Sequence, residues 1–138
     1  MSDAAFECTL CGCCCFSSAQ DYIPVVASAG TDGEGNSYNL NADTAAGAIG
    51  AALSARWLAF LTDVEGVRGR NGEAASSVSA DVARDMIAAG VIEGGMIPKV
   101  EACIRGARAG CSGIILDGRR AGALLSVVEG DAAGTIVA

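Results

Sequence analysis

The stretch Gly94-Gly95-Met96-Ile97-Pro98-Lys99-Val100-Glu101 joins a glycine loop to a predicted helix that runs to Ala109. Two adjacent glycines leave the backbone amides open to a ligand, and Pro98 has the φ of a first helical position. Lys99 then falls in the first turn, where the positive end of the helix dipole disfavours a cation. An anion in front of the helix would offset this cost. The stretch therefore predicts a phosphate-like ligand, the alternative being a solvated surface lysine after a flexible loop.

Strand and helix patterns alternate on both sides of this stretch. Asn41 and Ser79 are suitable N-caps for two of the helices, and Gly90 and Gly110 are suitable residues to end two of them. Predicted strands are 22–27, 37–40, 57–62 and 134–138, and residues 113–118 are predicted as a strand and the turn after it. Predicted helices are 42–54, 98–109, 121–128 and one that Ser79 caps and that runs through Ala89, and a hairpin turn is predicted at 30–36. This alternation predicts an α/β domain with a mainly parallel sheet, in which ligands bind outside the carboxyl ends of the strands. The small residues of helix 42–54 predict close packing against that sheet.

Composition narrows the classes of function. The chain has 138 residues, enough for one domain, and a formal charge of −7, which argues against a nucleic-acid partner. It contains no histidine, which excludes Ser-His-Asp and Cys-His catalysis and any histidine metal ligand. No apolar run approaches the roughly 18–20 residues of a membrane span, so no membrane partner is expected.

The first twenty residues differ from the remainder in composition. Five cysteines lie between Cys8 and Cys15, and Cys8 and Cys11 form a C-x-x-C pair without the second ligand pair of a closed zinc site. We therefore expect no metal, and the acidic start does not resemble a secretory signal. The sequence predicts a Cys-rich leader over 1–20 that lies outside the fold, followed by one domain over 21–138.

Polar side chains gather at two predicted strand ends. Strand alternation places Asn39 and Asn41 on the same side, with Asp43 just inside the following helix. Each has a structural alternative, since Asn41 can cap the helix and Asp43 can complement its dipole. Asp63 directly follows the buried strand 57–62, a position that suits either ligand binding or capping. The standard phosphate loops, Walker A and G-x-G-x-x-G, are absent.

Three motifs together resemble one family. Residues 38–46 (YNLNADTAA), 60–67 (FLTDVEGV) and 94–102 (GGMIPKVEA) are similar in order and spacing to the C-terminal half of the acetylglutamate kinases, which are amino acid kinases. The resemblance covers about residues 21–138 and implies a three-layer α/β/α sandwich of the carbamate kinase-like type, with its N-terminal half missing. It also implies transfer of the γ-phosphoryl group of ATP to the side-chain carboxylate of N-acetyl-L-glutamate, a step of arginine biosynthesis, with Mg²⁺ carried by the nucleotide.

The resemblance also implies roles for particular residues. Lys99 would stabilise charge on the transferring phosphoryl group, Asp43 would organise the catalytic lysines, and Asn39 would hold N-acetyl-L-glutamate. Such a reaction needs positioning and charge neutralisation rather than a strong base, which suits a chain without histidine. The implied nucleotide-binding residues are Asp63, Val64, Glu65, Gly66, Val67, Arg68, Val91, Ile92, Glu93, Gly95 and Met96.

Departures from the family pattern leave alternatives open. The family's second catalytic lysine belongs to a Gly-Gly loop of the N-terminal half, and nothing in residues 1–20 resembles it. We therefore expect little activity from this chain alone, and a homo-oligomer only when the other half is supplied. The expected compartment is the cytoplasm, or a plastid in a photosynthetic eukaryote. The alternatives are a non-catalytic nucleotide-binding or regulatory remnant, and another amino acid kinase acting on aspartate, carbamate or uridylate, which the Asn39–Asp43 motif disfavours.

Overall fold

A four-stranded sheet organises the part of the chain that the computed structural model describes, residues 23–69, 71–130 and 134–138. Its strands lie in the order β3 (Trp57–Thr62), β5 (Ser112–Asp117), β6 (Thr135–Val137) and β4 (Ser77–Val78). Strands β3 and β5 pair in parallel, as do β4 and β6, whereas β5 and β6 are antiparallel. The predicted α/β class with a mainly parallel sheet is confirmed.

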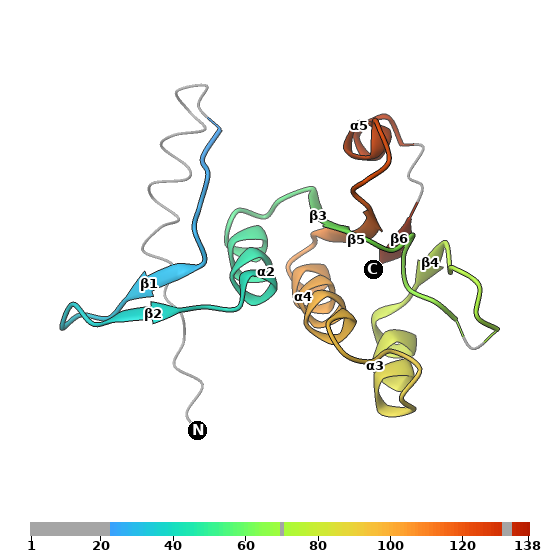
Figure 1. The fold of residues 1–138 in the computed structure, drawn as a ribbon, viewed down its shortest axis with the longest axis horizontal. Helices are drawn as coiled ribbons and strands as arrows, with labels where there is room; N and C mark the ends of the chain where they lie inside the picture. Colours follow the sequence, from blue (N-terminus) through green and yellow to red (C-terminus); the bar gives the residue numbers. More distant parts are fainter. Residues whose placement is uncertain (1–22, 70, 131–133) are drawn as a thin grey trace.

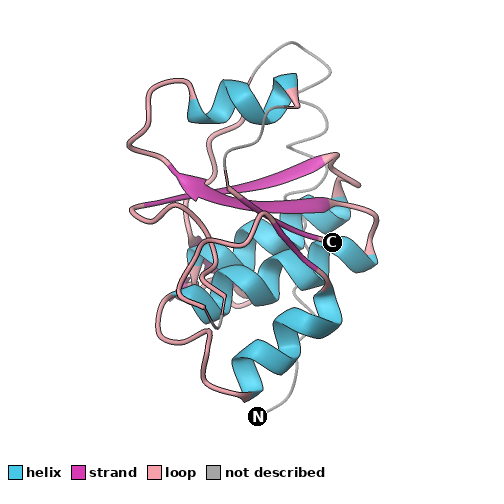
Figure 2. Cartoon of the chain, turned by 90° about the vertical axis from the view of Figure 1, so that its right-hand side faces the viewer, coloured by secondary structure: helices cyan, strands magenta, loops and turns pink. Residues whose placement is uncertain are grey.

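Helices cover both faces of this sheet. Helices α2 (Ala42–Ala52), α3 (Ala80–Ala88) and α4 (Met96–Arg108) lie on one face, and α5 (Ala123–Glu129) lies on the other (Figure 2). Strand alternation divides the core accordingly, because Phe60 and Ile115 pack with the three helices while Ile114 and Leu116 pack with α5. The three-layer α/β/α arrangement is therefore confirmed.

The predicted helix caps form in the structure. The side chain of Asn41 accepts a hydrogen bond from the Thr44 amide at 3.0 Å, and that of Ser79 accepts one from the Val82 amide at 3.3 Å. Helix α2 ends at Ala52, two residues earlier than predicted, and α4 begins at Met96, two residues earlier than predicted. The capping residues thus predicted the starts of α2 and α3 well, whereas Pro98 did not mark the start of α4.

The amino-terminal part of the described chain differs most from prediction. The predicted strand 22–27 is wrong over residues 23–27, where no strand forms and Ile23 and Val25 are 91% and 96% exposed. An apolar run becomes a strand only when a neighbouring strand supplies hydrogen bonds, and none pairs with this segment in the described part. The hairpin that follows is confirmed as β1 (Ala29–Thr31) and β2 (Ser37–Asn39), and it stands apart from the four-stranded sheet (Figure 1).

Small residues bring α2 close to α4 as well as to the sheet. A Cβ placed on Gly47 would lie 2.9 Å from the Cβ of Ala102 in α4, whereas one on Gly50 would lie 3.5 Å from Leu58 in β3. The tightest contact of α2 is therefore with a neighbouring helix, which the sequence prediction of sheet packing did not anticipate. This close approach sets the distance between the first turns of the two helices.

Two cysteines of the described part belong to the core. Cys103 and Cys111 are free and almost fully buried, and burial raises the pKa of the Cys103 thiol to about 12. Both therefore act as small apolar groups rather than as nucleophiles. The Cys8–Cys15 run lies outside the described residues. No helix in the described ranges is long and apolar enough to cross a membrane.

Candidate functional site

The first turns of α2 and α4 meet beyond the carboxyl ends of β3 and β5. Each helix is joined by a short connection to the strand that follows it, and β3 and β5 are parallel. Both helices therefore run against their strands, which brings their amino-terminal ends to the same edge of the sheet. This is the edge at which ligands bind in open α/β sheets.

Lys99 and Asp43 form an ion pair at this junction. The Nζ atom of Lys99 donates to Oδ2 of Asp43 at 2.9 Å, although the two residues are 56 positions apart. The side chains are 25% and 18% exposed, so the pair is partly shielded from water. An ammonium has three N–H donors, and the other two make no bond to the residues that the structure describes. Lys99 is also the only lysine among the 138 residues.

This pair changes the interpretation of the lysine at a helix start. The sequence argument required an external anion to offset the helix dipole, but the Asp43 carboxylate already provides a negative charge. The position of Lys99 is therefore explained within the protein. What points to a ligand is instead the partial exposure of the ammonium and its location at the ligand-binding edge of the sheet.

The glycine loop before α4 is open, as predicted. Gly94 has a φ of +57°, and a Cβ on either Gly94 or Gly95 would meet nothing within 4 Å. The amides of Met96 and Ile97 bond to the carbonyls of Glu93 and Gly94, at 3.3 and 3.2 Å. No bond from the Gly94 or Gly95 amide to a protein group is present within the described ranges. These two N–H groups are the free backbone donors nearest to the start of α4.

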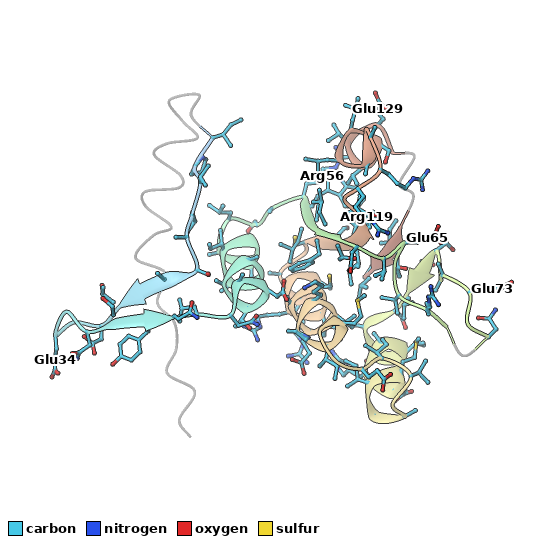
Figure 3. The ribbon with its side chains drawn as sticks, viewed as in Figure 1. Glu34, Arg56, Glu65, Glu73, Arg119 and Glu129 are labelled. Carbon is cyan, nitrogen blue, oxygen red and sulfur yellow. The ribbon has the colours of Figure 1, made fainter. Side chains whose placement is uncertain are left out.

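The second predicted segment forms the loop after β3. Asp63, Glu65 and Arg68 are exposed, whereas Gly66 and Val67 are buried. A pocket of about 500 Å³ opens beside this loop, and polar surface dominates its lining. The lining residues are Glu65, Gly66, Arg68, Gly72, Glu73 and Ala74. Figure 3 shows Glu65 and Glu73 on the same side of the molecule, far from Glu34 at the hairpin tip.

Two of the predicted nucleotide-binding residues have side chains in the core. Val67 is 1% exposed and Ile92 is 3% exposed, and both belong to the same apolar cluster under α3 and α4. Their side chains cannot reach a ligand without unfolding the core. Any contact that these two residues make with a nucleotide must therefore come from backbone atoms.

Thr135, which the site prediction did not include, is a buried polar residue beneath this loop. Its hydroxyl accepts a hydrogen bond from the Val67 amide at 2.8 Å and donates one to the Ala75 carbonyl at 2.5 Å. Burial of a polar side chain with both bonding capacities in use is a signal that only the structure provides.

Asp117, at the carboxyl end of β5, was also missed. Its carboxylate accepts bonds from the Arg119 amide and from two guanidinium nitrogens at 2.8–2.9 Å. These bonds lower the pKa of Asp117 to about 2, and Asp117 together with the nearby Asp63 raises the pKa of Arg119. An acid directly after a strand was the signal used for Asp63, and it applied equally to Asp117.

Not all the predicted polar residues converge. The side chain of Asn41 serves as the α2 cap, so its structural alternative is the one observed. Asn39 lies exposed on β2, opposite Ala29, and makes no side-chain bond to Lys99 or Asp43 in the described part. The structure therefore joins Lys99 and Asp43 but leaves Asn39 separate from them, and its predicted role is untested.

Comparison with known proteins places these features in a family. The amino acid kinase family model matches residues 15–117. The acetylglutamate kinase of Dinoroseobacter shibae is 47% identical over 119 residues, which is 85% of this chain and 42% of the relative. Two solved structures share the fold: N-acetylglutamate synthase from Neisseria gonorrhoeae (TM-score 0.83, 23% identity, 92% of this chain and 30% of that one) and carbamate kinase from Giardia lamblia (TM-score 0.65, 21% identity, 79% and 35%).

The coverage of the relatives is partial. This chain spans between 33% and 42% of the length of the curated acetylglutamate kinases that it matches first. The family match nevertheless includes Asp43 and Lys99, which form the ion pair, and the loop after β3. The chain belongs to the amino acid kinase family.

Proposed function

We propose that this chain is the nucleotide-binding part of an acetylglutamate kinase, which transfers the γ-phosphoryl group of ATP to the side-chain carboxylate of N-acetyl-L-glutamate. The observation that carries the proposal is the Lys99–Asp43 pair, which holds a partly exposed ammonium at the ligand-binding edge of the sheet. Identities of 47–52% to acetylglutamate kinases favour this activity over others in the family.

Each part of the site has a chemical task in the proposed reaction. The Lys99 ammonium neutralises charge that develops on the transferring phosphoryl group, and Asp43 fixes the direction in which the ammonium points. The open amides at Gly94 and Gly95 and the positive end of α4 favour phosphate oxygens. Asn39 is proposed to hold N-acetyl-L-glutamate.

Mg²⁺ is proposed to arrive with the nucleotide and to neutralise phosphate charge. In the described part, no group of three carboxylate or thiol side chains is arranged to hold a metal. The one carboxylate nearest to Lys99 is already bonded to the ammonium. Phosphate oxygens of the nucleotide would be its main ligands.

The single lysine allows a direct test of nucleotide binding. An acyl phosphate of ATP transfers its acyl group to a nearby amine, forming an amide and releasing ATP. We expect this reagent to acylate Lys99, the only lysine of the chain, and excess MgATP to prevent the reaction. Peptide mass spectrometry locates the amide, and Lys99→Arg serves as the control that cannot form it. Failure to acylate Lys99, or acylation that millimolar MgATP leaves unchanged, would contradict the proposal.

Turnover separates a catalytic chain from a nucleotide-binding module. With one lysine in the chain, transition-state charge is neutralised from one side only, so we expect little transfer to N-acetyl-L-glutamate by this chain alone. Release of ADP that depends on N-acetyl-L-glutamate measures the transfer. Rapid turnover by the chain alone would show that a second cationic side chain is not needed.

A further inference from the structure

We propose that Thr135 is a positioning residue for nucleotide binding: its hydroxyl holds the loop between β3 and β4 at Val67 and Ala75, and with it the pocket beside this loop. This proposal rests on the proposed function, because Thr135 would support the same nucleotide site. The backbone of Thr135 pairs with Ile115 of β5, while its side chain faces away from that pairing toward the loop.

The Thr135 hydroxyl extends the pairing of β6 with the neighbouring segment to the residues just before the start of β4. One residue later, the Ile136 amide bonds to the Ser76 carbonyl at 3.0 Å, and Ser77 then pairs with Ile136. The chain opposite Thr135 is the loop that precedes β4. There the side chain of Thr135, rather than its backbone, bonds to Ala75. The same oxygen accepts the Val67 amide, so one hydroxyl holds both arms of the loop.

The two arms are also joined to each other. The Ala75 amide bonds to the Val67 carbonyl at 2.9 Å, and the Gly69 amide bonds to the Glu73 carbonyl at 2.8 Å. The loop is therefore a small hairpin whose base is attached to the sheet by Thr135. Five of the six pocket-lining residues lie on this loop: Gly66, Arg68, Gly72, Glu73 and Ala74.

Two glycines make room for this arrangement. A Cβ on Gly66 would lie 2.4 Å from Oγ1 of Thr135, so no larger residue fits there while the hydroxyl stays in place. A Cβ on Gly134 would lie 2.5 Å from the Ile115 carbonyl, so a glycine is needed for β6 to begin this close to β5. A side chain at either position would therefore displace Thr135 or the strand that carries it.

The hydroxyl is chemically necessary at this position. Thr135 is 0% exposed, and its one donor and its acceptor lone pair serve the Ala75 carbonyl and the Val67 amide. Replacement by valine keeps the shape but leaves both groups without a partner in a buried setting. The hairpin base would then open to water, and the pocket-lining residues would lose their fixed position.

The test compares Thr135→Val with Thr135→Ser in the full chain. We expect T135V to speed amide hydrogen exchange over residues 66–76 and to weaken MgATP binding by about tenfold, while T135S behaves like the parent. Calorimetric titration with MgATP gives the affinity. Val127→Ala is the matched control, since it removes buried volume on the α5 face and should alter neither measurement.

Each outcome bears on a separate part of the proposal. Equal loss in T135V and T135S would assign the effect to packing and contradict a role for the hydroxyl. Faster exchange with unchanged MgATP affinity would show that the loop does not position the nucleotide. If the parent binds no MgATP, the proposed function fails, whereas the exchange comparison still decides whether Thr135 holds the loop. If T135V does not fold, hydrogen exchange of the Val67 amide is measured in the parent chain instead. An exchange rate as fast as that of an exposed amide would contradict the proposal.

Discussion

Two carboxylate–cation pairs lie at the carboxyl end of the sheet, and they differ in how the chain builds them. Asp117 and Arg119 are two residues apart and are joined by two side-chain bonds and one backbone bond. Asp43 and Lys99 are 56 residues apart and share a single bond. The first pair belongs to one turn after β5, whereas the second joins two helices.

The difference separates a structural pair from a candidate catalytic one. The Asp117 carboxylate accepts three bonds, from one planar guanidinium and one amide of Arg119, and these bonds hold the turn after the strand. The Lys99 ammonium has two donors that bond to nothing in the described part of the chain, and it meets Asp43 only when α2 and α4 pack together. A pair that depends on tertiary packing and leaves donors unused is suited to binding a third group.

Removal of the Lys99–Asp43 pair should have the largest effect, a loss of catalytic rate. In a chimera that supplies the N-terminal part of a curated acetylglutamate kinase relative, we expect Lys99→Ala to lower kcat by about 10²–10³-fold, because it deletes a charge that neutralises the transferring phosphoryl group. Asp43→Asn should lower kcat less, since the ammonium remains but loses its fixed direction. Coupled assay of ADP release measures both.

The local pair provides the control for this experiment. Arg119→Gln in the same chimera removes a cation at the same edge of the sheet and breaks the bonds that hold the turn after β5, but it does not touch the Lys99–Asp43 pair. We expect its kcat to stay close to that of the parent chimera. A loss as large as that of Lys99→Ala would show that the distinction between the two pairs is mistaken.

The sequence predicted more of the fold than of the site. The strand 57–62 and the caps at Asn41 and Ser79 followed from local chemistry, since an apolar run or a side-chain oxygen acts within a few residues. The segment 23–27 could not be predicted, because its state depends on a partner strand. Thr135 likewise needed the structure, because its two hydrogen-bond partners lie 60 and 68 residues away.

The packing of α2 against α4 should have an intermediate effect. Gly47→Ala adds a Cβ that would lie 2.9 Å from the Cβ of Ala102, so the helices must separate. We expect the free energy of unfolding to fall by about 1 kcal/mol, the overpacking cost exceeding the gain in helix propensity. Urea denaturation measures this change. Acylation of Lys99 by the ATP reagent should also slow, because the ion pair with Asp43 stretches.

Gly50 offers a matched control on the same helix. A Cβ there would lie 3.5 Å from a flexible Leu58 side chain, which is an ordinary contact distance. We expect Gly50→Ala to leave stability unchanged or slightly raised and to leave acylation of Lys99 unaffected. Similar destabilisation by the two substitutions would show that the α2–α4 contact is less tight than the structure indicates.

Loss of the Asp117–Arg119 pair should change stability only in acid, and this is the smallest of the expected effects. The pKa of Asp117 falls from 3.8 to about 2 because Arg119 bonds to its carboxylate, so ionised Asp117 stabilises the fold above about pH 4. That contribution is lost as the pH falls from about 4 toward 2, since the carboxylate of the folded chain then takes up a proton.

Asp117→Asn should therefore reduce the fall in stability across this window, while leaving the Lys99–Asp43 pair and acylation of Lys99 intact.

Asp32 also has a pKa of about 2, through bonds from Asn36 and Tyr38 in the β1–β2 hairpin, so Asp32→Asn is the comparison needed. Because that hairpin stands apart from the sheet, its protonation should loosen the hairpin without altering unfolding of the core. Urea midpoints at pH 5, 3.5 and 2.5, followed through Trp57 in β3, distinguish the two carboxylates. A pH profile that D117N leaves unchanged would mean that the turn after β5 does not depend on this pair.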